Sequence, residues 1–76
     1  MTESIREAIE RSVKGNAATM SVEVPDINEA YAQIKATADV VGIHPVNTGA
    51  DVWGEINGES FRLFIYEAEA KMTTKL

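Results

Sequence analysis

The first half of the chain alternates between two spacings of its apolar residues. Helical spacing of three and four predicts a helix over residues 3–14, with an apolar stripe of Ile5, Ala8, Ile9 and Val13. A spacing of two then predicts a half-buried strand over residues 17–24, which Pro25 ends. Helical spacing returns behind Asp26, a preferred N-cap residue, and predicts a second helix over residues 26–38.

The second half contains three runs rich in β-branched and aromatic residues. Residues 39–46 are interrupted by glycine and proline, which is typical of an edge strand or of one with a bulge near His44. Residues 50–56 and 59–67 flank Asn57-Gly58, a strong hairpin signal. The order is therefore a helix followed by a βαβββ unit. We expect one α+β domain with a four-stranded, mostly antiparallel sheet, and a tail over residues 68–76 that frays.

The predicted hairpin has two apolar faces. A two-residue turn at Asn57-Gly58 places residues 56 and 59 opposite each other and fixes every further pair. One face, expected to pack on the second helix, then carries Val52, Gly54, Ile56, Phe61, Leu63 and Ile65. The other face carries Asp51, Trp53, Glu55, Ser60, Arg62, Phe64 and Tyr66. Trp53 lies directly across from Arg62, where the guanidinium can stack on the indole.

The second face needs a cover, because three aromatic rings would otherwise expose a large apolar patch. The first helix, a second copy of the chain, or another protein or ligand would each provide one. Tryptophan, tyrosine and arginine are enriched at binding hot spots, and a chain of 76 residues gains stability from a shared core. We therefore interpret the face as an interface, with binding residues Trp53, Arg62, Phe64, Tyr66, Asp51 and Glu55.

Composition narrows the classes of partner. Twelve acidic and seven basic residues give a net charge of −5, which argues against direct nucleic-acid binding. The N-terminus is charged throughout, and no apolar run approaches the roughly 20 residues that a bilayer needs, so we expect no membrane segment. The chain has no cysteine, which favours a reducing cytoplasm.

No residue pattern specifies a catalytic or metal site. His44 is the only histidine, and the sequence identifies no nucleophile and no further metal ligands that would act with it. Ser60 lies in the hairpin without the glycine elbow of a hydrolase. We therefore expect a protein that is not an enzyme and that binds no metal and no cofactor.

The span from Ser21 to Glu67 resembles one βαβββ module of the vicinal oxygen chelate superfamily, which includes glyoxalases and bleomycin-resistance proteins. The residues that carry the resemblance are "VEVPDINEAYAQIK", Pro45, Trp53-Gly54 and the glycine turn before the last strand. The resemblance implies that two modules pair around a shared cavity, here as a homodimer. It also implies metal ligands at Thr19 and Glu67, but threonine is a poor ligand, and one carboxylate does not hold a catalytic ion.

Together these observations predict a non-catalytic protein-binding module that forms a homodimer and also binds another protein. A compact, acidic chain without cysteine suits an accessory or inhibitor protein, for example a viral one encoded by a phage. The alternative is a small-ligand-binding dimer with a cavity between the paired βαβββ modules.

Overall fold

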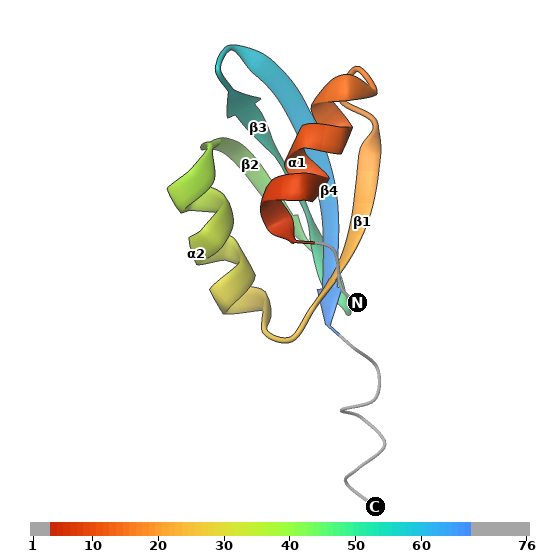
Figure 1. Cartoon of the computed structure of the whole chain (residues 1–76). Helices are drawn as coiled ribbons and strands as arrows, with labels where there is room; N and C mark the ends of the chain where they lie inside the picture. Colours follow the sequence, from red (N-terminus) through yellow and green to blue (C-terminus); the bar gives the residue numbers. More distant parts are fainter. Residues whose placement is uncertain (1–3, 68–76) are drawn as a thin grey trace, which may run out of the picture.

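Two helices and a four-stranded sheet make up the protein in the computed structural model, which describes residues 4–67 (Figure 1). The elements in chain order are α1 (Ile5–Lys14), β1 (Thr19–Val24), α2 (Ile27–Thr37), β2 (Asp39–Pro45), β3 (Gly49–Ile56) and β4 (Glu59–Glu67). This is the α+β fold that the sequence predicts. Residues 1–3 and the expected tail over 68–76 lie outside the described residues. Within 4–67, no helix has the length and apolar character to span a membrane.

The sheet is mixed, with the strand order β1-β4-β3-β2. The two pairs β2–β3 and β3–β4 are antiparallel, whereas β1 runs parallel to β4. The hairpin turn is the one expected, because Asn57 and Gly58 both take positive φ angles of 52° and 80°. Since β1 and β2 form opposite edges, the connection through α2 crosses the whole sheet (Figure 1).

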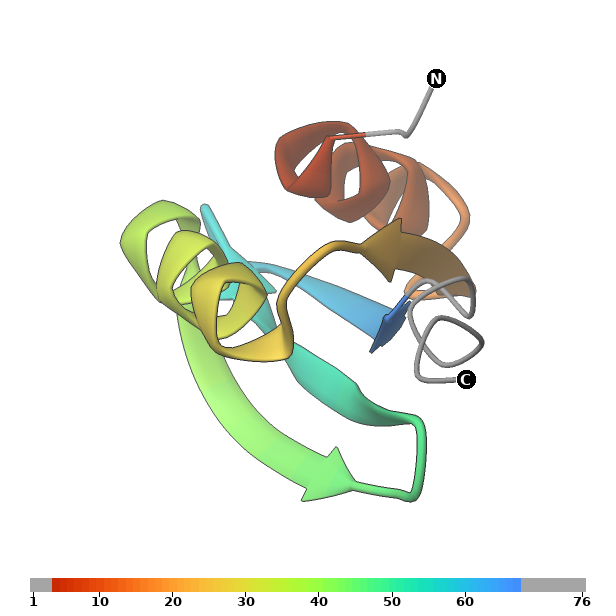
Figure 2. The same cartoon turned by 90° about the horizontal axis from the view of Figure 1, so that it is seen from below.

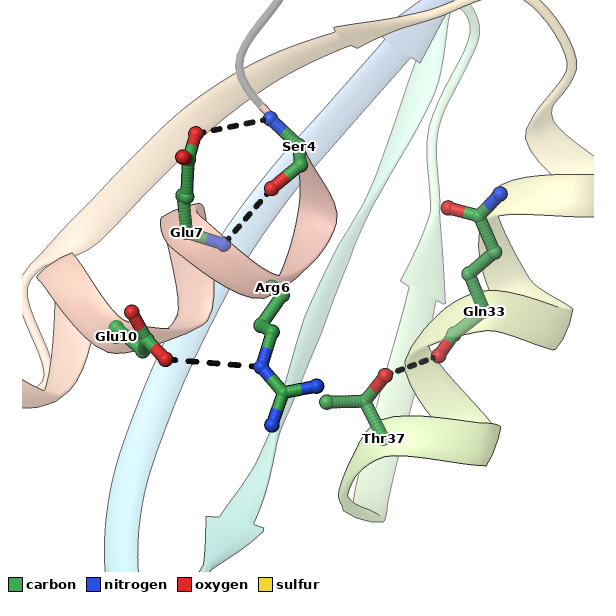
Figure 3. Close-up of polar contacts among 6 residues, drawn as sticks. All are labelled: Ser4, Arg6, Glu7, Glu10, Gln33 and Thr37. Atoms are coloured by element: carbon green, nitrogen blue, oxygen red, sulfur yellow. Dashed lines mark hydrogen bonds and ion pairs between the residues drawn. The ribbon is translucent and has the colours of Figure 1, made fainter.

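Side-chain caps fix the first turn of α1. The Ser4 hydroxyl accepts the Glu7 N–H at 3.1 Å, and the Glu7 carboxylate accepts the Ser4 N–H at 3.4 Å (Figure 3). This capping box satisfies two amide groups that have no partner inside the helix. On the exposed side of α1, Arg6 lies 3.7 Å from the Glu10 carboxylate (Figure 3).

The chain leaves α1 through two residues in the left-handed region. The Asn16 N–H donates to the Val13 carbonyl at 3.0 Å, and the Ala17 N–H donates to the Ser12 carbonyl at 2.8 Å. This is the Schellman pattern, with Asn16 at φ 59° and Ala17 at φ 66°. The sequence correctly places the helix end at Gly15-Asn16. Because the chain turns through Asn16 and Ala17, β1 begins at Thr19, two residues after its expected start.

Two carboxylates meet the first turn of α2. Asp26 accepts the N–H groups of Asn28 at 2.8 Å and Glu29 at 3.2 Å, as its N-cap position predicts. Glu67, at the end of β4, accepts the Ile27 N–H at 3.0 Å. At the other end of α2, the Thr37 hydroxyl donates to the Gln33 carbonyl at 2.8 Å (Figure 3).

Both helices pack on the same face of the sheet (Figure 2). Helix α1 lies against β4 and β1, α2 lies against β2 and β4, and the two helices also contact each other. The resulting core consists of Ile5, Ala8, Ile9, Val22, Val24, Ala30, Ile34, Ala50, Val52, Phe61, Leu63 and Ile65. The hairpin face expected to pack on the second helix therefore lies under both helices.

Ser12 is the one buried polar residue of α1, and it links the helix to β4 and to the residue that precedes β1. Its side chain is fully buried. The hydroxyl donates to the Ala18 carbonyl at 2.6 Å and accepts the Arg62 N–H at 2.8 Å. These two bonds hold the C-terminal half of α1 where β1 and β4 begin to pair. The position of α1 therefore depends on hydrogen bonds as well as on apolar packing.

Candidate functional site

The sheet face turned away from the helices, which we call the open face, contains all six predicted binding residues. Paired residues on neighbouring strands share a face, and successive residues of a strand alternate between faces. From the strand register, the open face carries Thr19, Ser21, Glu23, Asp39, Gly42, His44, Gly49, Asp51, Trp53, Glu55, Ser60, Arg62, Phe64 and Tyr66. Because α1 lies on the opposite face, the first of the three expected covers is excluded.

Trp53 lies across the middle of the open face, between β2 and β4. The Arg62 guanidinium carbon is 5.5 Å from the ring centroid, which confirms the stacking expected from the hairpin register. On the other side the indole covers Gly42, where an added Cβ would lie only 2.4 Å from Trp53 Cζ2. A glycine on the edge strand therefore gives the ring room to lie against the sheet. The indole is consequently half-buried without any cover from another element.

Two further aromatic rings extend this surface along β4. Phe64 and Tyr66 stack with their centroids 6.0 Å apart and their planes at 23°. Both residues are half-buried, as is Trp53 on the neighbouring strand. We call Trp53, Phe64 and Tyr66 the aromatic patch. It provides rigid apolar surface on paired strands rather than on loops.

The edge strand β2 adds a feature that the sequence pattern did not locate. The register shifts between Val40 and Gly42, so the bulge lies before the expected position near His44. Val41 is the extra residue, and 68% of it is exposed. Its place in a bulge explains why a large apolar side chain lies outside the core.

A hollow of about 360 Å³ lies beside Trp53. Its walls include Ala17, Val41, Trp53, Glu55, Ser60 and Arg62. The apolar side chains of Ala17 and Val41 and the ring of Trp53 therefore lie next to the carboxylate of Glu55 and the guanidinium of Arg62. This composition suits a side chain with an apolar stem and a charged end.

The two positions that the family resemblance implies as metal ligands are not brought together. Thr19 pairs with Arg62 and lies on the open face, whereas Glu67 pairs with Val24 on the helix-covered face. Glu67 instead accepts the Ile27 N–H. His44 lies opposite Asp51 at the exposed edge. Over residues 4–67, no three histidine, cysteine or acidic side chains are grouped so as to hold a metal ion.

Comparisons with protein-family models, with curated proteins and with solved structures find no match for this chain. The resemblance to the vicinal oxygen chelate superfamily therefore stays a prediction. The candidate site depends on the geometry of the open face alone.

Proposed function

We propose that the chain is a non-catalytic protein-binding module and that the open face is its contact surface. One observation supports this most strongly: both helices pack on one side of the sheet, and the aromatic patch lies on the other. No element within residues 4–67 covers that patch. An apolar surface of this kind on a small domain is typical of an interaction site.

The composition of the patch supports a protein partner. Tryptophan, tyrosine and arginine are the residue types that contribute most at protein interfaces. Trp53 is already held between Gly42 and Arg62 before any partner binds. Binding therefore loses little side-chain entropy at this position, which favours affinity.

Self-association through the same face, which the sequence predicts, is the alternative use of this surface and would compete with binding of a target. At 76 residues, the chain gains stability if a second copy shares the aromatic patch. An acidic accessory or inhibitor protein of the kind expected from the sequence would use this face either for a second copy or for its target. If the chain dimerises, its molar mass measured by sedimentation velocity should rise from that of the monomer at low protein concentration to twice that value at high concentration.

A selection from a library of displayed random peptides tests the proposed function. The immobilised wild-type chain is the target, and the Trp53→Ala chain, which keeps the net charge, is used for counter-selection. We expect peptides that bind the wild type and lose binding with Trp53→Ala. A selection without Trp53-dependent peptides, together with a monomer at every concentration, would contradict the proposal.

Small-ligand binding is a second candidate, favoured by the hollow beside Trp53. The hollow brings the Trp53 ring together with two charged groups, those of Glu55 and Arg62. A ligand that binds only the folded chain raises its melting temperature. A screen of small aromatic compounds should then produce thermal shifts that disappear in the Trp53→Ala variant.

A further inference from the structure

The two layers of the protein differ in their charged residues. Four of the five cations within residues 4–67 lie on the helices, namely Arg6, Arg11, Lys14 and Lys35. Arg62 is the fifth and lies on the open face. That face carries four carboxylates, those of Glu23, Asp39, Asp51 and Glu55. The aromatic patch is therefore bordered mainly by negative charge.

Two of these carboxylates face each other. Asp39 on β2 is the direct partner of Glu55 on β3, and both residues are exposed on the open face. Like charges at directly opposed positions destabilise a sheet. A cation from a partner would remove this repulsion. Glu55 also lines the hollow beside Trp53, whereas Asp39 lies outside it and borders a second hollow with Glu55 and Lys35. A cation in the hollow beside Trp53 would therefore meet Glu55 next to the aromatic patch.

We infer that the open face binds a different protein whose contact surface places lysine or arginine around an apolar centre. This inference rests on the proposed function and names the chemistry of its partner. Glu55 and Arg62 both line the hollow. A lysine or arginine side chain of the partner would therefore lay its stem along Trp53 and Val41 and place its charge at Glu55 rather than at the guanidinium. The partner's apolar centre then covers the stacked rings of Phe64 and Tyr66.

A second copy fits this surface less well. It would bring the same four carboxylates and only one guanidinium to the interface. Carboxylates that are buried without a cation carry a large desolvation cost. Nucleic acids and anionic membranes also have the wrong sign of charge. A basic protein surface is the occupant that matches both the apolar and the charged parts of the face.

Peptides selected as described above test this inference through two matched double variants. Asp39→Asn/Glu55→Gln removes two carboxylates from the open face. Glu10→Gln/Glu29→Gln removes two exposed carboxylates from the helices, so the net charge changes equally. The probes are the peptides that bind the wild type and not the Trp53→Ala chain, and their dissociation constants are measured by fluorescence anisotropy.

We expect these peptides to be enriched in lysine and arginine next to apolar residues. The open-face double variant should raise their dissociation constants about three- to tenfold, whereas the helix double variant should change them less than about twofold. Raising the salt concentration from about 50 mM to about 500 mM should also weaken binding, because it screens exposed charges.

Trp53-dependent peptides without cations, or equal effects of the two double variants, would overturn the inference and leave the proposed function intact. A Trp53-dependent dimer that is tighter than every selected peptide would also overturn it in favour of a second copy. A selection with no Trp53-dependent peptide and a monomeric chain would overturn both proposals.

Discussion

Replacing Ser12 with alanine tests why α1 lies on the face opposite the aromatic patch. The side chain is fully buried, and its hydroxyl is shared between the Arg62 N–H at 2.8 Å and the Ala18 carbonyl at 2.6 Å. Alanine removes both hydrogen bonds. The space left by one oxygen atom is too small for a water molecule to replace them.

The size of the effect follows from the groups that lose their partner. A buried donor or acceptor without a hydrogen bond costs about 1–3 kcal/mol. We expect Ser12→Ala to lower the free energy of unfolding by about 1–3 kcal/mol, since the Arg62 N–H and the Ala18 carbonyl both lose a part-buried hydrogen bond. For a chain of 76 residues this corresponds to a fall in melting temperature of about 5–20 °C.

Urea unfolding followed by circular dichroism measures this change. Thr37→Val is the control, because it removes a hydroxyl that donates to a helix carbonyl at 2.8 Å in an exposed position. We expect the control to change the free energy of unfolding by less than about 0.5 kcal/mol. Equal losses in the two variants would show that the buried hydroxyl does not fix α1 on the sheet.

Three further expectations follow from single features of the chain. Ala17 has a φ of 66°, so Ala17→Gly should raise the free energy of unfolding by about 0.5–1 kcal/mol. The control Ala18→Gly should lower the free energy of unfolding, and equal changes of the two variants in urea unfolding would refute this expectation. Gly42→Ala places a methyl group within 2.4 Å of Trp53 Cζ2, so the indole emission should shift to the red; an unchanged spectrum would contradict the packing. Chelator should leave the melting temperature unchanged, and one divalent ion per chain by elemental analysis would refute the expectation of no metal.

Local signals in the sequence were sufficient for most of the fold. The spacing of the apolar residues predicted both helices and β1, and runs of β-branched and aromatic residues predicted the other three strands. Asp26 and Asn57-Gly58 predicted a cap and a turn. The left-handed exit at Asn16 and Ala17 was not predicted, because alanine gives no sign of a positive φ. The parallel pairing of β1 with β4 also depends on contacts between residues far apart in the sequence.

The candidate site was predicted only in part. Hairpin register correctly paired Trp53 with Arg62 and separated the two faces. It could not decide which face α1 covers, since both faces carry apolar residues. A serine at position 12, next to the apolar stripe of α1, was the available signal, but its partners lie just before β1 and on β4, and the helical pattern does not specify them. The bulge at Val41 and the close packing of the Trp53 ring on Gly42 likewise depend on strand pairing.

Titration of the isotope-labelled chain with a selected peptide, followed by nuclear magnetic resonance, shows directly whether the open face is the binding surface. We expect the amide and indole shifts to change most at Trp53, Arg62, Phe64 and Tyr66, while those of α1 and α2 change little. Shift changes concentrated on the helices, with the open face unaffected, would contradict the assignment of the open face as the binding surface.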